Sequence, residues 1–565
     1  MCAVCRIVVA TLAVILVALS QPPVTRRPSV GDGTIRAVHY FGLSRYGWPI
    51  NYLSAVELDR VDGELAQIAA DGFNGIVLLV PWGEVQPGLT PHPSYSDTAL
   101  SRLNALVGAA EARGLEVILR VPYAWAINPD QQMPNVERMG ALFFDDRVRA
   151  TFIDAIRTID RRVVKPHSNV RLAFASWEDF YMIQHVPAGA LPLQFRESFS
   201  RFARERHDAA TLASIFRTPI DPVGLVPLPK ANAPGWQVFL EFIDTRIAAI
   251  TAEMARALSV PFSFEVRVDG DPVLVDGRIT EWFLHNKTYD VSTSDVTTVY
   301  YAPYLGQMNV GERLTAAQAM KGLRSALDGI HRHTKNRLFI DQFNVVYNSP
   351  GFKAHARLLD AEMDRFLDQA AAYIANETLG YALWAYKDYH QNLLYNPSFQ
   401  QGLHGWETDG RVQHGSHGLE LRAGAAVRQV VGAERMAQAV GPDAPLQLCV
   451  WASSATGGAI AMSDGVAAYE TFVLSAEGPT TRGHCVDLRK RPGDYTVTFR
   501  ALSGPVLLDG AVMSAHHEIA DIYDVENRPA QLRSTFVRFN RQFAAARSVS
   551  KPPVLNDDDR PGPQQ

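Results

Sequence analysis

The sequence predicts an α/β chain in which a closed (β/α)₈ barrel over residues 35–390 is followed by an antiparallel β-sandwich over residues 391–520. The barrel is predicted because apolar runs alternate with amphipathic helical patterns, and eight such units fit this length. The sandwich, a jelly roll, is predicted because short alternating strands separated by turns begin after Tyr389. Residues 521–565 are expected to form a closing helix, at 529–545, and a disordered tail rich in Pro and Asp.

The eight barrel strands are expected at residues 37–43, 75–80, 116–121, 170–176, 261–266, 296–301, 337–343 and 379–386. Helices between them are expected at residues 56–70, 97–113, 146–163, 236–258, 314–333 and 354–376, where apolar residues recur at helical spacing. A doubly wound open sheet is the alternative. No glycine-rich phosphate turn follows the first strand, so the pattern favours the closed barrel.

The N-terminus indicates export. Arg6 precedes an apolar run at 7–19, and small residues stand at Ala18 and Ser20, the two positions that a signal peptidase reads. Residues 1–20 are therefore expected to be a signal peptide, with an uncleaved membrane anchor as the alternative. Residues 21–34 are expected to be a linker. The protein is expected in the periplasm or outside the cell, free or tethered to the membrane through its N-terminus.

Composition narrows the classes of ligand. A net charge of −5 gives no reason to expect a nucleic-acid partner, because binding to phosphates needs a basic face. No Cys/His pattern resembles a metal site, so neither a metal nor a cofactor is expected, and the oligomeric state is not indicated. Cys2 and Cys5 lie in the N-terminal segment, whereas Cys449 and Cys485 lie in strand-like contexts. In an oxidising compartment the latter two are expected to form a disulfide, with two free thiols as the alternative.

Two consecutive units carry a family resemblance. In residues 71–87 a helix ends in Gly-Phe-Asn, a strand runs to Trp82 and a loop closes with Pro, and residues 103–121 end in the run Gly-Leu-Glu-Val-Ile-Leu-Arg-Val. These motifs resemble clan A glycoside hydrolases, the superfamily of retaining (β/α)₈ enzymes with cellulase-like, β-galactosidase-like and xylosidase-like members. The resemblance implies an enzyme that hydrolyses an oligosaccharide or polysaccharide at the C-terminal end of its barrel.

The resemblance also implies two catalytic positions, an acid/base Glu that ends strand four and a nucleophile Glu that ends strand seven. Glu178 falls at the first, where a carboxylic acid protonates the leaving oxygen and then activates water. Trp177 replaces the Asn that precedes this Glu in the family. The second position holds Gln342, an amide that cannot act as a nucleophile, and Asp341 precedes it.

Asp341 is the leading nucleophile candidate. Because side chains alternate along a strand, Asp341 and Gln342 point to opposite sides unless the strand end is bulged. Glu265 at the end of strand five and Asp388 at the end of strand eight are the alternatives. A further alternative is a barrel that has lost hydrolysis and binds glycan, as an accessory factor in exopolysaccharide assembly or export. For Glu178, the alternative is a surface glutamate beside a helix start.

Five residues at strand ends are expected to contact the sugar: Trp82, Arg120, Tyr301, Gln342 and Trp384. In the superfamily an aromatic residue near strand six touches the nucleophile and a Trp in strand eight lies under the −1 sugar, and Tyr301 and Trp384 match these by type. The alternative is that each of these aromatic residues packs in the hydrophobic core. The same strand ends also carry Tyr123, Tyr300 and Tyr304.

The start of the sandwich carries a second resemblance. The run from Asn396 to Trp406 fits the pattern Asn-Pro-x-Phe-Glu-x-Gly-x-x-x-Trp, with Gln400 in place of Glu, and residues 508–512 read Leu-Asp-Gly-Ala-Val. Both resemble jelly-roll carbohydrate-binding modules, which implies a sandwich that binds glycan. A sandwich that only supports the barrel, with Trp406 in its core, is the alternative.

Overall fold

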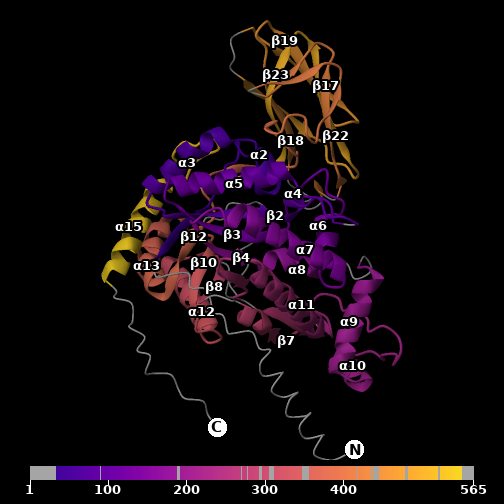
Figure 1. Ribbon diagram of the computed structural model, residues 1–565, viewed down its shortest axis with the longest axis vertical. Helices are drawn as coiled ribbons and strands as arrows, with labels where there is room; N and C mark the ends of the chain where they lie inside the picture. Colours follow the sequence, from indigo (N-terminus) through magenta and orange to yellow (C-terminus); the bar gives the residue numbers. More distant parts are fainter. Residues whose placement is uncertain are drawn as a thin grey trace, which may run out of the picture.

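The computed structural model describes residues 33–549 except 90, 187–190, 269, 277, 292–294, 304–310, 346–355, 416–417, 434, 437–444, 477–480 and 520–521. Over this part of the chain a closed parallel barrel is followed by two antiparallel sheets, which confirms the predicted fold class (Figure 1). The expected signal peptide, most of the linker, Tyr304 and the tail from residue 550 lie outside the described residues.

The barrel strands are β1 (Ile35–His39), β2 (Gly75–Pro81), β3 (Glu116–Tyr123), β4 (Val170–Ala175), β5 (Phe262–Val266), β8 (Val296–Tyr301), β10 (Arg337–Phe343) and β12 (Thr378–Leu383). They close in the order β1-β12-β10-β8-β5-β4-β3-β2. β2 and β12 are buried along their whole length, as expected of strands covered on both faces. The eighth strand ends at Leu383, so Trp384 follows it and does not lie in it.

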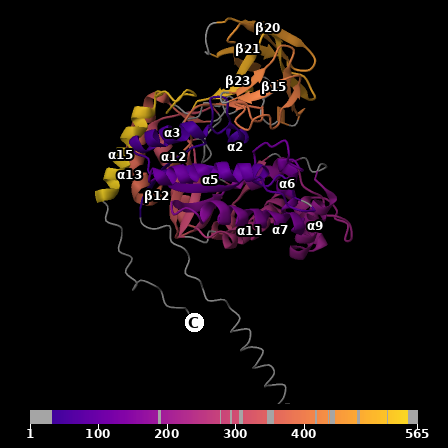
Figure 2. The ribbon, with the colours of Figure 1, turned by 45° about the horizontal axis from the view of Figure 1, so that its top comes forward.

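The predicted helices form the outer layer: α3 (Leu58–Ala70), α5 (Asp97–Ala112), α7 (Asp146–Ile159), α11 (Trp236–Ala257), α12 (Ala316–His331) and α13 (Met363–Glu377). The closing helix is α15 (Arg533–Val549), which extends past its predicted end at residue 545. It packs beside α13 (Figure 2), where its Phe539 contacts the ring of Tyr381 on β12. No helix of the described part of the chain is long and apolar enough to cross a bilayer.

The inward-facing side chains of the barrel change from apolar to polar toward the C-terminal ends of the strands. Apolar residues fill the interior, namely Ile35, Ala37, Val77, Ile118, Leu172, Phe174, Val296, Phe339, Leu379 and Ala382. Two residues further along β1, β3 and β10 the inward positions hold His39, Arg120 and Asp341. These positions are buried and lie at the C-terminal end of the barrel, so the alternation of the strands concentrates polar groups there.

Long insertions after the fourth and fifth strands enlarge the same end of the barrel. They contain α8 (Trp177–Tyr181), α9 (Leu193–Arg206), α10 (Ala209–Phe216) and the hairpin of β6 (Asp271–Val275) and β7 (Arg278–Phe283). Arg267 pairs with Asp271 at 2.9 Å and lies over the Trp177 ring, while His285 bonds Asp244 at 2.9 Å. The insertion after β5 is thereby fixed against Trp177, the neighbour of Glu178.

The sandwich has two sheets. One contains β13 (Tyr389–Asn392), β15 (Val412–Gly415), β16 (Gly418–Leu421), β18 (Leu446–Ser453), β21 (Arg482–Leu488) and β23 (Val506–Glu518). The other contains β14 (Glu407–Asp409), β17 (Ala426–Val431), β19 (Gly458–Ser463), β20 (Ala468–Leu474) and β22 (Tyr495–Ser503). Cys449 and Cys485 face each other on β18 and β21 and form the predicted disulfide, with an S–S distance of 2.08 Å. Trp406 lies in the sandwich core.

The sandwich packs against the segment that follows β1. Figure 1 shows it near α2 (Tyr52–Ala55), which belongs to that segment. Tyr46 packs on Trp451 with 4.8 Å between ring centres, and its hydroxyl donates to Asp509 at 2.6 Å. The Asn51 amide donates to the backbone oxygens of Asn392 and Leu394. These bonds fix the orientation of the two domains.

Candidate active site

The ends of β3 and β4 are joined by an ion-pair network. The Arg120 guanidinium contacts Asp179 at 3.0 Å through Nε and Glu178 at 3.1 Å through Nη2. Asp179 also accepts the Ala124 N–H at 2.9 Å. Burial raises the pKa of Asp179 to about 6, against the opposing effect of Arg120. Arg120 and Asp179 are buried, whereas 33% of the Glu178 side chain is exposed, so Glu178 is the accessible acid of this network.

A second pair of carboxyl groups, Glu265 on β5 and Asp341 on β10, lies fully buried beside this network. Each of the two groups affects the pKa of the other, and Ser176 donates its hydroxyl to Glu265 at 2.6 Å. No N–H or O–H donor of the described residues bonds to either Asp341 carboxylate oxygen. Because two carboxylates cannot donate to each other, a hydrogen bond between Glu265 and Asp341 requires that one of the two groups is protonated.

The environments of these two carboxyl groups decide which one holds the proton. Burial raises the pKa of Glu265 well above its usual range, and the negative charge of Asp341 raises it further. Burial raises the pKa of Asp341 to about 6, while the hydrogen bond from Glu265 and the charge of Arg120 limit the rise. At neutral pH Glu265 is therefore the protonated member of the pair and Asp341 the carboxylate.

A β-bulge at Asp341 sets the direction of the residues at the end of β10. Against β8, Ile340 pairs with Val299 and Gln342 with Tyr300, so Asp341 has no partner of its own. Gln342 lies opposite Tyr300, while the next pair, Phe343 and Tyr301, packs outward among the helices. Asp341 and Gln342 thus both turn to the inside of the barrel, which is the bulged arrangement that the sequence left open.

His39 and Trp384 border the Asp341 side of the site. His39 Nε2 lies 2.8 Å from the Asp341 backbone oxygen, and the His39 and Trp384 rings are 4.8 Å apart. Burial lowers the pKa of His39 to about 3, so its ring is neutral and donates to that oxygen from Nε2. Trp384 is partly exposed and its ring packs against His39, and its role as a sugar platform stays a prediction.

Two expected sugar contacts lie elsewhere. The Trp82 indole donates to Gln86 at 2.8 Å and packs on Phe152 of α7, so it belongs to the helix layer. The Tyr301 hydroxyl donates to the Ala319 backbone oxygen of α12 at 3.0 Å. Both side chains point away from the barrel interior because they occupy outward positions, and this corrects the expectation that they contact the substrate.

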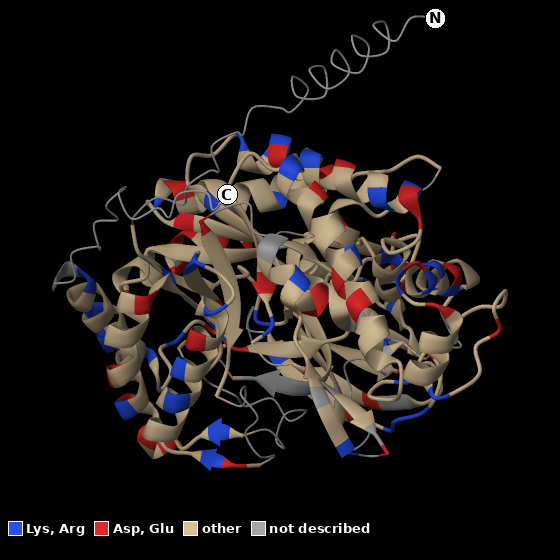
Figure 3. Cartoon of the chain, turned by 90° about the horizontal axis from the view of Figure 1, so that it is seen from below, with Lys and Arg blue, Asp and Glu red and all other residues tan. Residues whose placement is uncertain are grey.

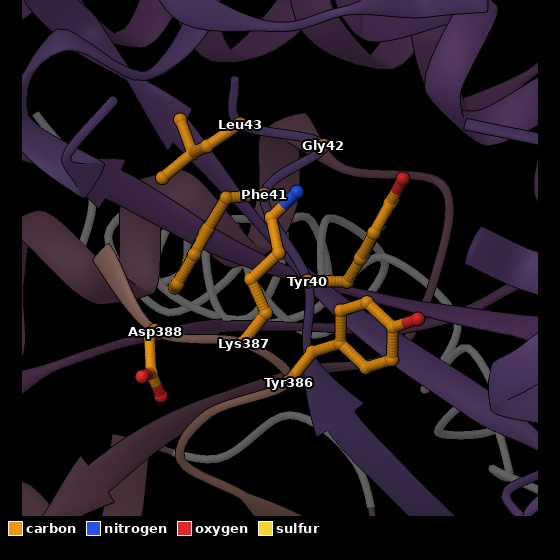
Figure 4. A pocket seen from close by; sticks show the side chains of 7 residues that line it. All are labelled: Tyr40, Phe41, Gly42, Leu43, Tyr386, Lys387 and Asp388. Carbon is orange, nitrogen blue, oxygen red and sulfur yellow. The ribbon is translucent and has the colours of Figure 1, made fainter. Parts of the chain in front are cut away.

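Asp388, the alternative nucleophile after strand eight, lines a different cavity. This cavity holds about 10 Å³, room for a single water, and is bordered by Tyr40, Tyr386 and Lys387. Figure 4 shows the Asp388 carboxylate directed away from the two tyrosine hydroxyls. Lys387 pairs with the buried Glu64 at 2.6 Å. The space is too small for a sugar, so Asp388 does not join the carboxyl groups of the barrel interior.

Sequence reasoning missed Ser176, Asp179 and His39. His39 ends β1 and Ser176 directly follows β4, each as a polar residue beside a long apolar run, and that contrast is the signal that would have found these two. Asp179 lies four residues after β4, and its position beside Glu178 is the signal for it. Figure 3 shows acidic and basic residues interspersed over the helices in that view. The expectation of no nucleic-acid partner stays a prediction.

No protein-family model and no curated protein matches the chain. Among solved structures, a β-glucosidase is 14% identical and covers 63% of this chain and 88% of its own, with a TM-score of 0.37. The GH5_18 protein of Streptomyces cattleya in complex with GlcNAc is 15% identical and covers 64% and 72%, with a TM-score of 0.39. The exo-β-1,4-mannosidase of Opitutaceae bacterium strain TAV5 is 14% identical and covers 64% and 54%, with a TM-score of 0.41. Similarity of this size describes the fold alone, and no residue role follows from it.

Proposed function

We propose that the chain is an exported glycoside hydrolase that cleaves an oligosaccharide or polysaccharide by a retaining mechanism. One observation carries the proposal: Glu178, after strand four, contacts Arg120 at 3.1 Å, and Glu265 and Asp341 lie fully buried at the ends of strands five and seven of the same barrel. They lie at the C-terminal end of the barrel, where enzymes of this architecture hold their active sites. The signal-like residues 1–20 support export.

In this mechanism Glu178 is the acid/base and Asp341 the nucleophile. The Asp341 carboxylate attacks the anomeric carbon and forms an ester bond, while Glu178 gives its proton to the departing glycosidic oxygen. Glu178 then takes a proton from water, whose oxygen attacks the same carbon and releases Asp341 as a carboxylate. Glu178 suits the first role because it is the accessible acid of the network.

The surrounding residues hold these two groups in place. Arg120 fixes the Glu178 carboxylate at 3.1 Å. In this mechanism protonated Glu265 donates a hydrogen bond that orients the Asp341 carboxylate. Trp384 offers a partly exposed aromatic face beside Asp341, and Gln342 adds an amide that faces the interior. In this reading Gln342 contacts a sugar hydroxyl, a role that an amide can fill although it cannot be the nucleophile.

The second candidate is a glycan-binding protein that does not hydrolyse. Asp341 and Glu265 have no exposed surface, and an amide occupies the position where the resembling enzymes carry their nucleophile. Both features favour a barrel that keeps its buried acids for structure. Such a protein would bind glycan through the sandwich or the barrel mouth and serve as an accessory factor in exopolysaccharide assembly or export.

A panel of aryl glycosides and polysaccharides tests the two candidates. Glu178→Gln should reduce hydrolysis of unactivated glycans by about 10²–10⁴-fold, while aryl glycosides with good leaving groups are less affected because they need no proton. Asp341→Asn should abolish hydrolysis of both. Glu205→Gln, at an exposed position of α9, is the control and should match wild type. Binding of a glycan with no turnover on the whole panel would replace the first candidate by the second.

A further inference from the structure

A pocket of about 170 Å³ lies at the junction of the barrel and the sandwich. Pro129, from the segment that follows β3, forms one wall. Tyr395, Val430 and Arg435 are among the sandwich residues that form the others. We call this space the junction pocket. Since a water occupies about 30 Å³ of the liquid, the junction pocket has room on the order of one sugar ring.

The walls of the junction pocket are fixed by hydrogen bonds. The Gln429 amide accepts the Tyr395 N–H at 2.7 Å and donates to the backbone oxygens of Tyr395 and Gly405 at 3.0 Å each. The His404 ring bonds Asp130 at 2.8 Å, which joins the sandwich to the barrel beside Pro129. A pocket that keeps its shape without ligand loses little entropy when it binds one. The residues that build it include the motif that resembles carbohydrate-binding modules.

The residues that line the junction pocket carry an excess of positive charge. Arg428 pairs with Glu407 at 2.7 Å, and both side chains are largely exposed. Arg435 donates one hydrogen bond, from Nη1 to the Leu393 backbone oxygen at 3.0 Å, and no carboxylate of the described residues pairs with it. Burial lowers the pKa of Arg435 to about 10. The pocket is therefore bordered by a partly buried cation that lacks an acidic partner within the described part of the chain.

We propose that the junction pocket binds one acidic sugar unit, a monosaccharide that carries a carboxylate, with Arg435 as the group that recognises the carboxylate. An arginine fork matches the two oxygens of a carboxylate, and the bond is stronger where water is partly excluded. Pro129 and Val430, both exposed, provide apolar contact for the C–H face of the sugar. The proposal rests on the proposed function in one respect only, that the ligand is a glycan.

Calorimetric titration of the full mature chain tests this proposal. The probes are acidic tetrasaccharides of galacturonate, glucuronate and mannuronate, each compared with its carboxyl-reduced neutral form. Glu178→Gln protein is used so that turnover does not consume the probe. At least one acidic probe should bind, its neutral form should bind about tenfold more weakly or not at all, and the affinity should fall with added salt.

Three variants locate the binding. Val430→Asp places a negative charge at the pocket and should weaken the acidic probe by about tenfold or more. Val473→Asp, an exposed valine on β20 at the other edge of the same sheet, is the matched control and should bind as wild type. Arg435→Gln should lose the preference for the acidic form, with the melting temperature recorded to confirm folding.

Three results would overturn the proposal: no acidic probe binds, acidic and neutral forms bind equally, or the two aspartate variants weaken binding equally. These results are independent of catalysis, because the probe is not turned over. If the protein hydrolyses glycans but binds no acidic probe, only the proposed binding at the junction pocket is refuted. If the protein binds the acidic probe but hydrolyses no glycan, only the proposed hydrolase activity is refuted.

Discussion

At the scale of single residues, the Glu265–Asp341 pair sets the charge at the centre of the barrel. Asp341 has a pKa of about 6 against an ordinary 3.8, because burial penalises its charged form. A carboxyl group with a raised pKa stabilises the fold below the unfolded value, and this contribution is lost as pH rises through the folded value. The native protein therefore carries a buried charge at pH 7.5 that it does not carry at pH 4.

Asp341→Asn should consequently raise the free energy of unfolding at pH 7.5, by about 2 kcal/mol. The asparagine oxygen still accepts the Glu265 proton, so the hydrogen bond survives the substitution. The gain should shrink as pH falls from 6 to 4, where Asp341 in the native protein becomes neutral. Urea unfolding at the two pH values measures it, and a variant less stable than wild type at pH 7.5 would contradict this account of the pair.

Glu265→Gln distinguishes a proton-holding residue from a nucleophile. Glutamine also donates a hydrogen bond to Asp341, so kcat should stay within about tenfold of wild type near neutral pH. Asp341→Asn should remove activity. The kcat/KM of both the wild type and Glu265→Gln should fall as pH drops through about 6, because Asp341 must be ionised to attack. If Glu265→Gln is inactive and Asp341→Asn is active, the nucleophile is Glu265 and not Asp341.

At the scale of elements, the strands could be predicted because each is a continuous apolar run bounded by turn residues. β8 and β10 match their expected bounds, and β5 begins one residue later than expected. The ends of strands were less predictable, since one bulge decides which of two neighbouring residues faces inward. The sequence shows that Asp341 and Gln342 are adjacent, but only the pairing with β8 turns both inward.

The same reason explains the misplaced aromatic residues. Trp82 and Tyr301 stand at strand ends, but their inward or outward direction follows from the register of the neighbouring strands. The secondary structure of the insertions was not predicted either. The β6–β7 hairpin and α10 are short, and the spacing of their apolar residues does not distinguish them from loops. Glu265 could be named as an alternative because it ends a predicted strand.

The disulfide is the element-scale feature with the clearest energetic consequence. Cys449 and Cys485 are 36 residues apart and join adjacent strands of one sheet. Closing a segment of this length stabilises a protein by about 3–4 kcal/mol, mainly by restricting the unfolded chain. The double substitution to serine should lower the free energy of unfolding by about this amount in exported protein. Equal stability of the two proteins under oxidising conditions would show that the bridge contributes nothing.

At the scale of the whole molecule, the barrel and the sandwich are predicted to unfold together. Tyr46, Asn51 and Arg45 of the barrel are bonded to the sandwich, and Asn392 returns a bond from its amide to the Tyr46 backbone oxygen. A network of buried side chains across a junction couples the stabilities of two domains. Their mutual orientation could not be predicted from the sequence, because it depends on contacts between residues several hundred positions apart.

Calorimetry of the full chain should therefore show one transition, with the calorimetric enthalpy equal to the van't Hoff enthalpy. Tyr46→Ala removes the ring contact with Trp451 and the bond to Asp509, and should separate the melting into two transitions. Ser454→Ala, which removes a hydroxyl bonded only within the sandwich, is the comparison and should keep a single transition. Two transitions in the wild-type protein would contradict the coupling.

The central claim is that Asp341 forms a covalent bond to the sugar while Glu178 supplies the proton. Mass spectrometry after incubation with a panel of 2-deoxy-2-fluoroglycosides bearing good leaving groups tests it directly, because the fluorine slows release of the glycosyl-enzyme ester. We predict an added sugar mass on the wild-type protein, mapped to Asp341 in the peptide that contains β10 and absent in Asp341→Asn. A label on Glu265, or no label from any member of the panel, would contradict the claim.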